Sequence, residues 1–188
     1  MTLFKNEYRI ESTRLRGWDY SGAGWYFVTI CTRGRECVFG DVVNGEMRLS
    51  SVGEIVADEW RKTPTIRPNV ELDEWIVMPN HLHGIIVITY PVETTRRVVS
   101  TELSRRVVST RQQSSRLLSN SLGSIIGQIK SVCTKRIRLS GCHEFDWQER
   151  FHDEIIWNEL ALNNIRKYIV DNPARWNIDR ENPVGLWM

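Results

Sequence analysis

Residues 70–89 of the chain read VELDEWIVMPNHLHGIIVIT. β-branched, aromatic and other apolar residues are concentrated in two runs, 70–78 and 82–89, as is typical of β-strands. The Pro79-Asn80 step between the two runs is a common turn dipeptide. We therefore predict two strands joined by a tight turn.

Another apolar run, WYFVTICT at residues 25–32, predicts a strand whose near-continuous hydrophobic character favours a central position in a sheet. The Asn-Gly step within residues 42–50 predicts a β-hairpin. Helical spacing of apolar residues predicts three helices, at about 51–63, 117–139 and 158–171. This order of elements predicts an α+β domain in which helices pack on one face of an antiparallel sheet.

The length and composition of the chain fit a single globular domain. It has 188 residues, of which 41% are hydrophobic and 26% charged, and its net charge is +2. No apolar run approaches the roughly 20 residues of a membrane helix, and the N-terminus lacks the pattern of a signal peptide. The four cysteines form no CxxC pair, so we expect free thiols in a reducing cytoplasm and no membrane partner.

Positive charge is concentrated in one part of the chain. From Arg96 to Arg138, ten arginines and lysines stand against a single glutamate, a local net charge of +9. Such a segment either binds the phosphate backbone of a nucleic acid or is a solvated basic loop. At about residues 91–116 it contains the imperfect repeat RRVVSTELSRRVVST, which indicates a low-complexity insert. The insert either extends a DNA surface or is a slipped duplication that the fold tolerates.

Two histidines lie at the start of the second strand of the opening stretch. Side chains alternate across a strand, so His81 and His83 point to one face and Leu82 points to the other. Two imidazoles on one face can share a divalent metal, and a mixed nitrogen and oxygen ligand set also accepts Mg²⁺ or Mn²⁺. The alternative is a pair of strand histidines that bond to backbone groups or water.

The last predicted helix carries Tyr168 and Asn172 at positions i and i+4, so both side chains share one helix face. A tyrosine hydroxyl is a poor nucleophile near neutral pH because its pKa is about 10, and a metal on the phosphate offsets that weakness. A site that combined the two histidines, the tyrosine and the amide would therefore be suited to form a phosphotyrosine. Taken separately, Tyr168 is also typical of a ring packed beside the stripe of Leu162, Ile165 and Ile169, and Asn172 of a helix C-cap.

The stretch MPNHLHGIIVI resembles the HUH motif, histidine-hydrophobic-histidine, of single-tyrosine transposases. More specifically, the chain resembles the tyrosine transposases associated with repetitive extragenic palindromes (REP) in bacteria. The resemblance runs through LRGWDYSGAGWYFVTICTRGRECVFG, LSSVGEIVADEW, WIVMPNHLHGIIV, LGSIIGQIKSVCTKRI and WQERFHDEIIWNELALNNIRKYIVDNPARW. It covers nearly the whole chain except the insert.

This resemblance implies a ferredoxin-like or RRM-like sheet, an HUH nuclease core with the histidines on a central strand. His81, His83 and Asn172 would be the ligands of a Mg²⁺ or Mn²⁺ ion. Tyr168 would attack a DNA phosphate and leave a 5′-phosphotyrosine and a free 3′-hydroxyl. The substrate would be single-stranded DNA beside a palindromic hairpin, rejoined by the reverse attack. Such proteins include monomers and swapped dimers, so both a monomer and a homodimer stay open.

Cationic side chains bind phosphates without reading sequence, and the chain has them in its N-terminal arm and on its long helix. The predicted DNA contacts are Arg14, Arg16, Lys130, Lys135 and Arg136. Unpaired bases would stack on aromatic side chains, for which the candidates are Trp18, Tyr20 and Trp176 unless these lie in the core.

His152, within the segment FHDEII, either orients a phosphate as an accessory residue or makes a structural contact with Asp153 or with a backbone group. Two other functions stay open beside that of a nuclease. A domesticated protein would bind palindromic hairpins without cutting them, although it would not need the complete set of histidines, tyrosine and amide. A metal phosphoesterase on small substrates would keep its hydrolytic activity without Tyr168.

Overall fold

Four strands form an antiparallel sheet in the order β6-β7-β3-β8. The structure of the protein is a computed structural model that describes residues 3–4, 7–8, 15, 17–90 and 120–178. The strands are β3 (Gly24–Cys31), β6 (Val70–Met78), β7 (His81–Ile88) and β8 (His152–Ile155). One long helix follows β3 and another precedes β8, so the chain runs β-α-β-β-α-β, the order of a ferredoxin-like fold. The predicted α+β class is confirmed.

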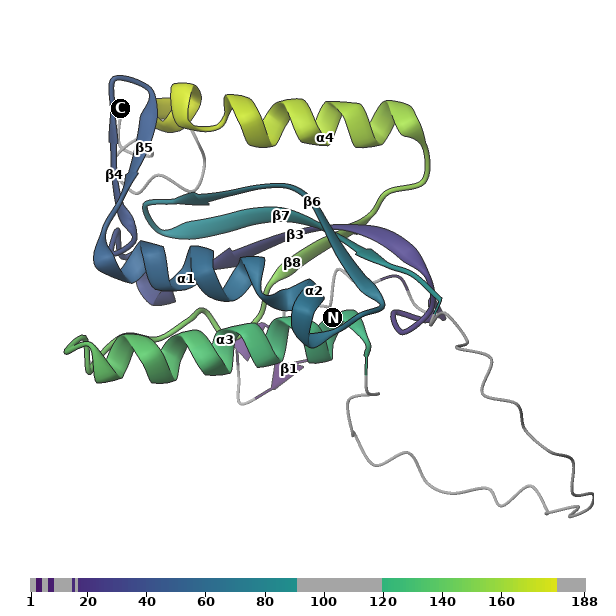
Figure 1. The fold of residues 1–188 in the computed structure, drawn as a ribbon, viewed down its shortest axis with the longest axis horizontal. Coiled ribbons are helices and arrows are strands. Elements are labelled where there is room, and N and C mark those ends of the chain that lie inside the picture. Colours follow the sequence, from purple (N-terminus) through teal and green to yellow (C-terminus); the bar gives the residue numbers. More distant parts are fainter. Residues whose placement is uncertain (1–2, 5–6, 9–14, 16, 91–119, 179–188) are drawn as a thin grey trace, which may run out of the picture.

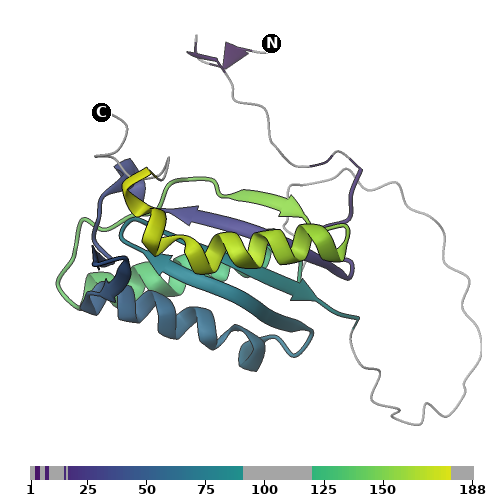
Figure 2. The same cartoon turned by 90° about the horizontal axis from the view of Figure 1, so that it is seen from above.

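Helices cover both faces of this sheet (Figures 1 and 2). On one face, called the α1/α3 face, lie α1 (Ser51–Arg61), the short α2 (Thr63–Ile66) and α3 (Leu122–Leu139), and on the other, the α4 face, lies α4 (Glu159–Asp171). The prediction that helices pack on one face only was wrong. The reason is that β3 and β7 are apolar on both sides, so a bare face would expose a large hydrophobic surface.

Alternation along the central strands produces two hydrophobic cores. On the α1/α3 face, Ile86 of β7 packs in a large cluster that also contains Trp60 of α1. On the α4 face, Ile85 of the same strand packs with Phe27 of β3 and Ile169 of α4. Neighbouring residues of β7 thus belong to different cores, and the odd-numbered positions of this strand lie under α4.

Close packing on β7 depends on Gly84. Trp60 is fully buried against this position, and a Cβ added to Gly84 would lie only 2.3 Å from Cζ2 of the indole ring. A glycine in a strand is typical of a site where another element approaches the backbone closely. The contact fixes α1 against the strand that carries both histidines.

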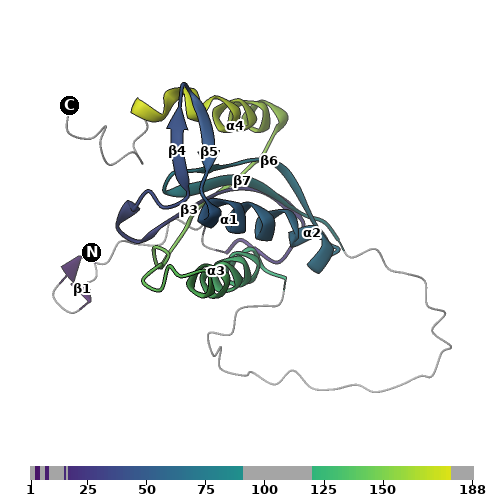
Figure 3. The ribbon, with the colours of Figure 1, turned by 60° about the vertical axis from the view of Figure 1, so that its left-hand side comes forward.

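The predicted hairpin is formed by β4 (Gly40–Val43) and β5 (Glu46–Leu49). Its turn residues have positive φ angles, 54° at Asn44 and 77° at Gly45, as a type I′ turn requires. The hairpin stands at one end of the sheet beside the 3-10 helix η2 (Pro173–Ile178), which follows α4 (Figure 3). Three further elements are short: β1 (Leu3–Phe4), β2 (Glu7–Tyr8) and the 3-10 helix η1 (Arg33–Arg35).

The insert predicted at about 91–116 lies outside the described residues. Within the described ranges, no helix combines the length and apolarity that crossing a membrane requires. All four cysteines are free thiols: Cys31, Cys37, Cys133 and Cys142.

Candidate active site

Strand β7 places both histidines under α4. Cys31 of β3 pairs with His81 and Thr29 pairs with His83, while Leu82 between them packs in the core of the α1/α3 face. The two imidazole rings lie 4.3 Å apart between centroids, and their exposed fractions are 0% and 1%. The prediction that His81 and His83 share one face and Leu82 lies on the other is confirmed.

The Nδ1 atom of each histidine makes a hydrogen bond with a neighbouring side chain. The side-chain oxygen of Asn80 lies 2.8 Å from Nδ1 of His81, and the hydroxyl of Thr29 lies 2.9 Å from Nδ1 of His83. Such contacts orient an imidazole and leave its Nε2 atom for a ligand. In the sequence, Asn80 is recognisable only as a turn residue and Thr29 only as part of a strand. The contact of Asn80 could have been suspected because this residue directly precedes His81. The contact of Thr29 follows only from the pairing register of β3 with β7.

Helix α4 brings Tyr168 to the histidines across 85 residues of sequence. Its hydroxyl lies 3.2 Å from Nε2 of His83, and the two rings lie 5.1 Å apart between centroids. The tyrosine ring also packs edge-on against Phe27, so it is partly buried in the core of the α4 face. Tyr168 therefore has a packed ring and a hydroxyl directed at His83.

Asn172 follows Tyr168 by one helical turn, and only 1% of its surface is exposed. It is the C-cap residue of α4, and its backbone N–H bonds to the carbonyl of Ile169. The helix-cap interpretation is thus correct for the backbone, while the amide side chain lies buried at the same end of α4 as the tyrosine.

Burial determines the protonation state of His81. It lowers the pKa of His81 to about 3, and the positive charge of Arg35 adds to this shift. The ring is therefore neutral near pH 7, which is the form that binds metals. Its Nε2 atom is buried without a hydrogen-bond partner within the described part of the chain, an arrangement that proteins seldom leave uncompensated.

The donors present fit a divalent metal only with a mixed ligand set. Among the described residues, no group of three or more His, Cys, Asp or Glu side chains is arranged to hold a metal ion. Two neutral imidazoles supply nitrogen donors, and an amide oxygen would have to supply the third protein ligand. The buried lone pair on His81 fits such an ion, and Asn172 is the amide on the tyrosine face of α4.

The predicted DNA-binding cations on α3 lie across the sheet from Tyr168. The ammonium of Lys130 donates to the backbone oxygens of Gln148 at 2.5 Å and Glu149 at 3.4 Å, and burial lowers the pKa of this lysine. Arg136 pairs with Asp58 and Glu59 of α1, whereas Lys135 is exposed. Arg14 and Arg16 lie outside the described residues.

His152 occupies the same sheet face as the catalytic candidates. It lies on β8, and it pairs with Thr29, which in turn pairs with His83, so the three residues form one row across the sheet. Its side chain is exposed, and that of the next residue, Asp153, points to the opposite face because side chains alternate along a strand.

The aromatic candidates divide between the core and the site. Trp176 of η2 lies against His81, with 6.0 Å between ring centroids. Trp18 donates from its indole N–H to the hydroxyl of Tyr26, and Tyr20 packs on the same tyrosine ring, so both pack against the larger core.

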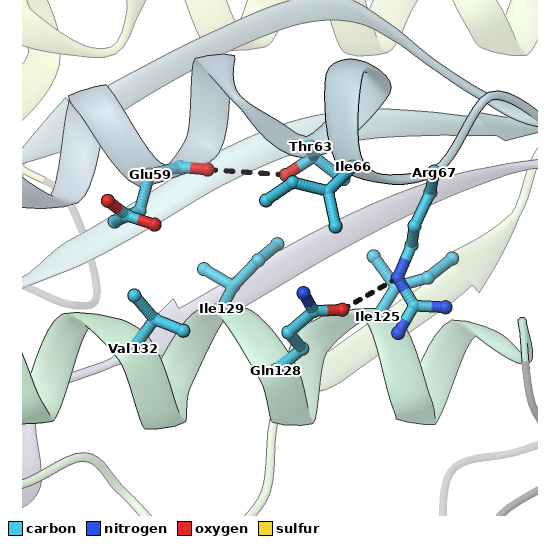
Figure 4. Close-up of a pocket in the computed structure, with 8 residues that line it drawn as sticks. All are labelled: Glu59, Thr63, Ile66, Arg67, Ile125, Gln128, Ile129 and Val132. Atoms are coloured by element: carbon cyan, nitrogen blue, oxygen red, sulfur yellow. Dashed lines mark hydrogen bonds between the residues drawn. The ribbon is translucent and has the colours of Figure 1, made fainter.

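A small pocket between α1, α2 and α3 is unrelated to the histidines (Figure 4). Its wall includes Arg67, which donates to the side chain of Gln128 on α3, and Glu59, whose backbone oxygen accepts from Thr63. These contacts belong to the α1/α3 face and join the helices of that face to each other.

The chain is similar to known proteins in sequence and in fold. No protein-family model matches it. A protein of Haemophilus influenzae whose function is uncharacterised is 35% identical over 170 residues, covering 90% of this chain and 91% of that protein. The solved structure of a REP-associated tyrosine transposase bound to a REP hairpin has a TM-score of 0.56 at 18% identity, covering 88% of this chain and 74% of that one. The chain therefore belongs to one family with the Haemophilus influenzae protein, and it has the fold of the REP-associated tyrosine transposase.

Proposed function

We propose that the protein is a metal-dependent endonuclease and strand transferase that cuts single-stranded DNA at palindromic hairpins through Tyr168. The observation that carries this proposal is the hydroxyl of Tyr168, which lies 3.2 Å from Nε2 of His83, whose ring centroid lies 4.3 Å from that of His81. A tyrosine that served packing alone would have no need of a buried histidine pair, one of whose Nε2 atoms faces its hydroxyl.

In the proposed reaction, the Tyr168 oxygen forms a bond to the phosphorus of the DNA backbone as the bond from phosphorus to the 3′ oxygen breaks. The tyrosine hydroxyl loses its proton, and the departing 3′ oxygen takes one up, so a 5′-phosphotyrosine and a 3′-hydroxyl result. Attack by a 3′-hydroxyl on the phosphotyrosine reverses these changes and rejoins DNA. No high-energy cofactor is required because the phosphodiester energy is kept in the phosphotyrosine.

His81, His83 and Asn172 would hold the metal, Mg²⁺ or Mn²⁺. When bound, such an ion would polarise the phosphoryl oxygen and offset the high pKa of the tyrosine. The protein supplies the remaining requirement, which is position. Packing of the Tyr168 ring on Phe27 leaves the hydroxyl little freedom, and positioning of a nucleophile contributes much of the rate of such reactions.

The neighbour of similar fold was solved with a REP hairpin, which supports hairpin DNA as the substrate here. DNA contacts at Arg14, Arg16, Lys130, Lys135 and Arg136 stay predictions. Contacts at Lys130 and Arg136 would have to replace the intramolecular bonds that these side chains make. His152 stays a candidate accessory residue because it lies in the row of Thr29 and His83.

The test is a covalent-adduct assay. The protein is mixed with labelled single-stranded oligonucleotides that carry palindromic hairpins from its own genome, together with Mn²⁺ or Mg²⁺, and separated on a denaturing gel. We expect a band of protein plus DNA that disappears with a chelator and in Tyr168→Phe. Tight hairpin binding with no adduct would contradict the proposal and favour a protein that binds without cutting, and hydrolysis retained by Tyr168→Phe would favour a phosphoesterase.

A further inference from the structure

The side chain of Asn80 joins two parts of the candidate active site. This residue lies in the turn between β6 and β7, and only 1% of its surface is exposed. Its Oδ1 atom lies 2.8 Å from Nδ1 of His81, and its Nδ2 atom donates to the backbone oxygen of Arg35 at 3.1 Å. One amide thus connects a candidate metal ligand with the η1 segment that follows β3.

The contact with Arg35 determines which way the amide faces. A backbone oxygen can only accept a hydrogen bond, so the NH₂ group of Asn80 must face Arg35. The carbonyl oxygen of the amide must then face His81. A reversed amide would bring two oxygens together at Arg35 and lose the hydrogen bond there.

The orientation of Asn80 in turn selects the tautomer of His81. Because Oδ1 is an acceptor, Nδ1 of the imidazole must carry the hydrogen, and in a neutral ring Nε2 then carries the lone pair. That Nε2 atom is the buried atom without a hydrogen-bond partner among the described residues. The lone pair is therefore held in place before any metal arrives.

Thr29 has a different effect on His83. A hydroxyl both donates and accepts, so its 2.9 Å contact with Nδ1 holds the ring but is compatible with either tautomer. Selection of a tautomer is specific to the amide of Asn80.

The η1 segment depends on the same amide. Arg35 has a φ of 58°, a left-handed conformation that residues with a Cβ seldom adopt. The bond from Asn80 to its carbonyl helps to hold this conformation next to His81.

We propose that Asn80 is a positioning residue of the metal site, which fixes His81 as the tautomer whose Nε2 lone pair binds the divalent cation. The metal in this statement rests on the proposed function. The tautomer is a property of the protein alone and can be measured without metal, DNA or activity.

The experiment compares the wild-type protein with Asn80→Ala, Asn80→Asp and Thr32→Val. Long-range ¹H–¹⁵N NMR of histidine-labelled protein, with the His81 signals assigned by His81→Gln, reports the tautomer. The electron paramagnetic resonance signal of free Mn²⁺ reports the affinity for Mn²⁺ without DNA. We expect His81 to populate both tautomers in Asn80→Ala. We also expect this variant to bind Mn²⁺ about 10- to 100-fold more weakly, as is general when a metal ligand loses its hydrogen-bond partner.

The two other variants separate positioning from stability of the turn. Aspartate keeps an acceptor at His81, so Asn80→Asp should retain the wild-type tautomer and bind Mn²⁺ more tightly than Asn80→Ala. The hydroxyl of Thr32 bonds to the backbone oxygens of Asn80 and Glu36, so Thr32→Val loosens the same turn without touching the imidazole contact. It should leave the tautomer and the affinity unchanged.

Two results would overturn this inference alone: a wild-type tautomer and affinity in Asn80→Ala, or a loss in Thr32→Val as large as that in Asn80→Ala. In either case the wild-type protein would still form its covalent adduct. A wild-type protein that binds no Mn²⁺ and forms no adduct would instead overturn the proposed function, and with it the role of Asn80 in metal binding.

Discussion

At the scale of single residues, the two histidines differ in what their Nε2 atoms face. Nε2 of His83 lies 3.2 Å from the Tyr168 hydroxyl, whereas Nε2 of His81 is buried without a partner in the described part of the chain. The proposed metal would be held by both histidines, so it would satisfy the buried Nε2 atom of His81. Nε2 of His83 would then no longer be available to the Tyr168 hydroxyl, which would be left to attack the phosphate.

On the face of β7 opposite the histidines, close packing of Trp60 leaves no room for a side chain at Gly84. We expect Gly84→Ala to lower the free energy of unfolding by about 1–3 kcal/mol or more, because its Cβ would meet the fully buried ring of Trp60. Urea unfolding followed by circular dichroism measures this loss. The matched control is Gly127→Ala on α3, where a Cβ meets no atom within 4 Å and where alanine should stabilise the helix by about 0.5–1 kcal/mol. Equal stability of Gly84→Ala and wild type would show that α1 does not pack on β7 in this way.

At the scale of elements, α4 is joined to the edge strand β6 by an ion pair. Arg166 donates to both carboxylate oxygens of Asp73, at 2.7 and 2.6 Å. Asp73 lies at the irregularity of β6 between Leu72 and Trp75, where the strand departs from regular pairing with β7. The ion pair thus helps to hold the helix that carries Tyr168 over the strand that carries the histidines.

This ion pair predicts a pH dependence. The hydrogen bond from Arg166 lowers the pKa of the Asp73 carboxyl in the folded protein. Its stabilising contribution is therefore present above the unfolded value of about 3.9 and is lost as the pH falls through the lower folded value. We expect Asp73→Asn to destabilise the protein at pH 7, by less than Gly84→Ala because the pair is partly exposed, and to destabilise it less at pH 2 than at pH 7. Thermal unfolding at both pH values measures the difference, and an equal effect at the two would contradict the assignment.

The sequence predicted those elements whose pattern is local. Alternation placed His81 and His83 on one face, and the i, i+4 spacing placed Tyr168 and Asn172 on one side of a helix. Strand β8 escaped prediction because its four residues, His-Asp-Glu-Ile, carry no apolar alternation and are held only by pairing with β3. The same limit applies to the face that α4 covers, to the Thr29–His83 contact and to the partners of Arg136, all of which depend on residues distant in sequence.

At the scale of the whole molecule, the β-α-β-β-α-β unit supplies a sheet, and α4 adds a second covered face. The turn between β6 and β7, the C-terminal end of α4 and η2 meet at one end of this sheet (Figure 1). Residues of the candidate site come from these elements and from β7 and β3. The α1/α3 face contributes a supporting core, in which Cys133 of α3 is fully buried.

Thiol labelling tests this arrangement of layers. Burial, together with the negative charge of Glu59, raises the pKa of the Cys133 thiol to about 12, so almost no reactive thiolate is present at pH 8. We expect iodoacetamide at pH 8 to label the exposed Cys142 quickly and Cys133 only when the protein unfolds. Mass spectrometry of peptides after timed labelling measures both rates. Labelling of native Cys133 as fast as Cys142 would contradict the packing of α3 on the sheet.

The most direct test of the central claim is to locate the covalent bond between protein and DNA. The adduct formed with a hairpin oligonucleotide and Mn²⁺ is digested with nuclease and trypsin, and the modified peptide is sequenced by mass spectrometry. We expect a nucleotide attached through its 5′-phosphate to Tyr168 and to no other tyrosine. A nucleotide on a different residue, or cleavage with no residue modified, would contradict it.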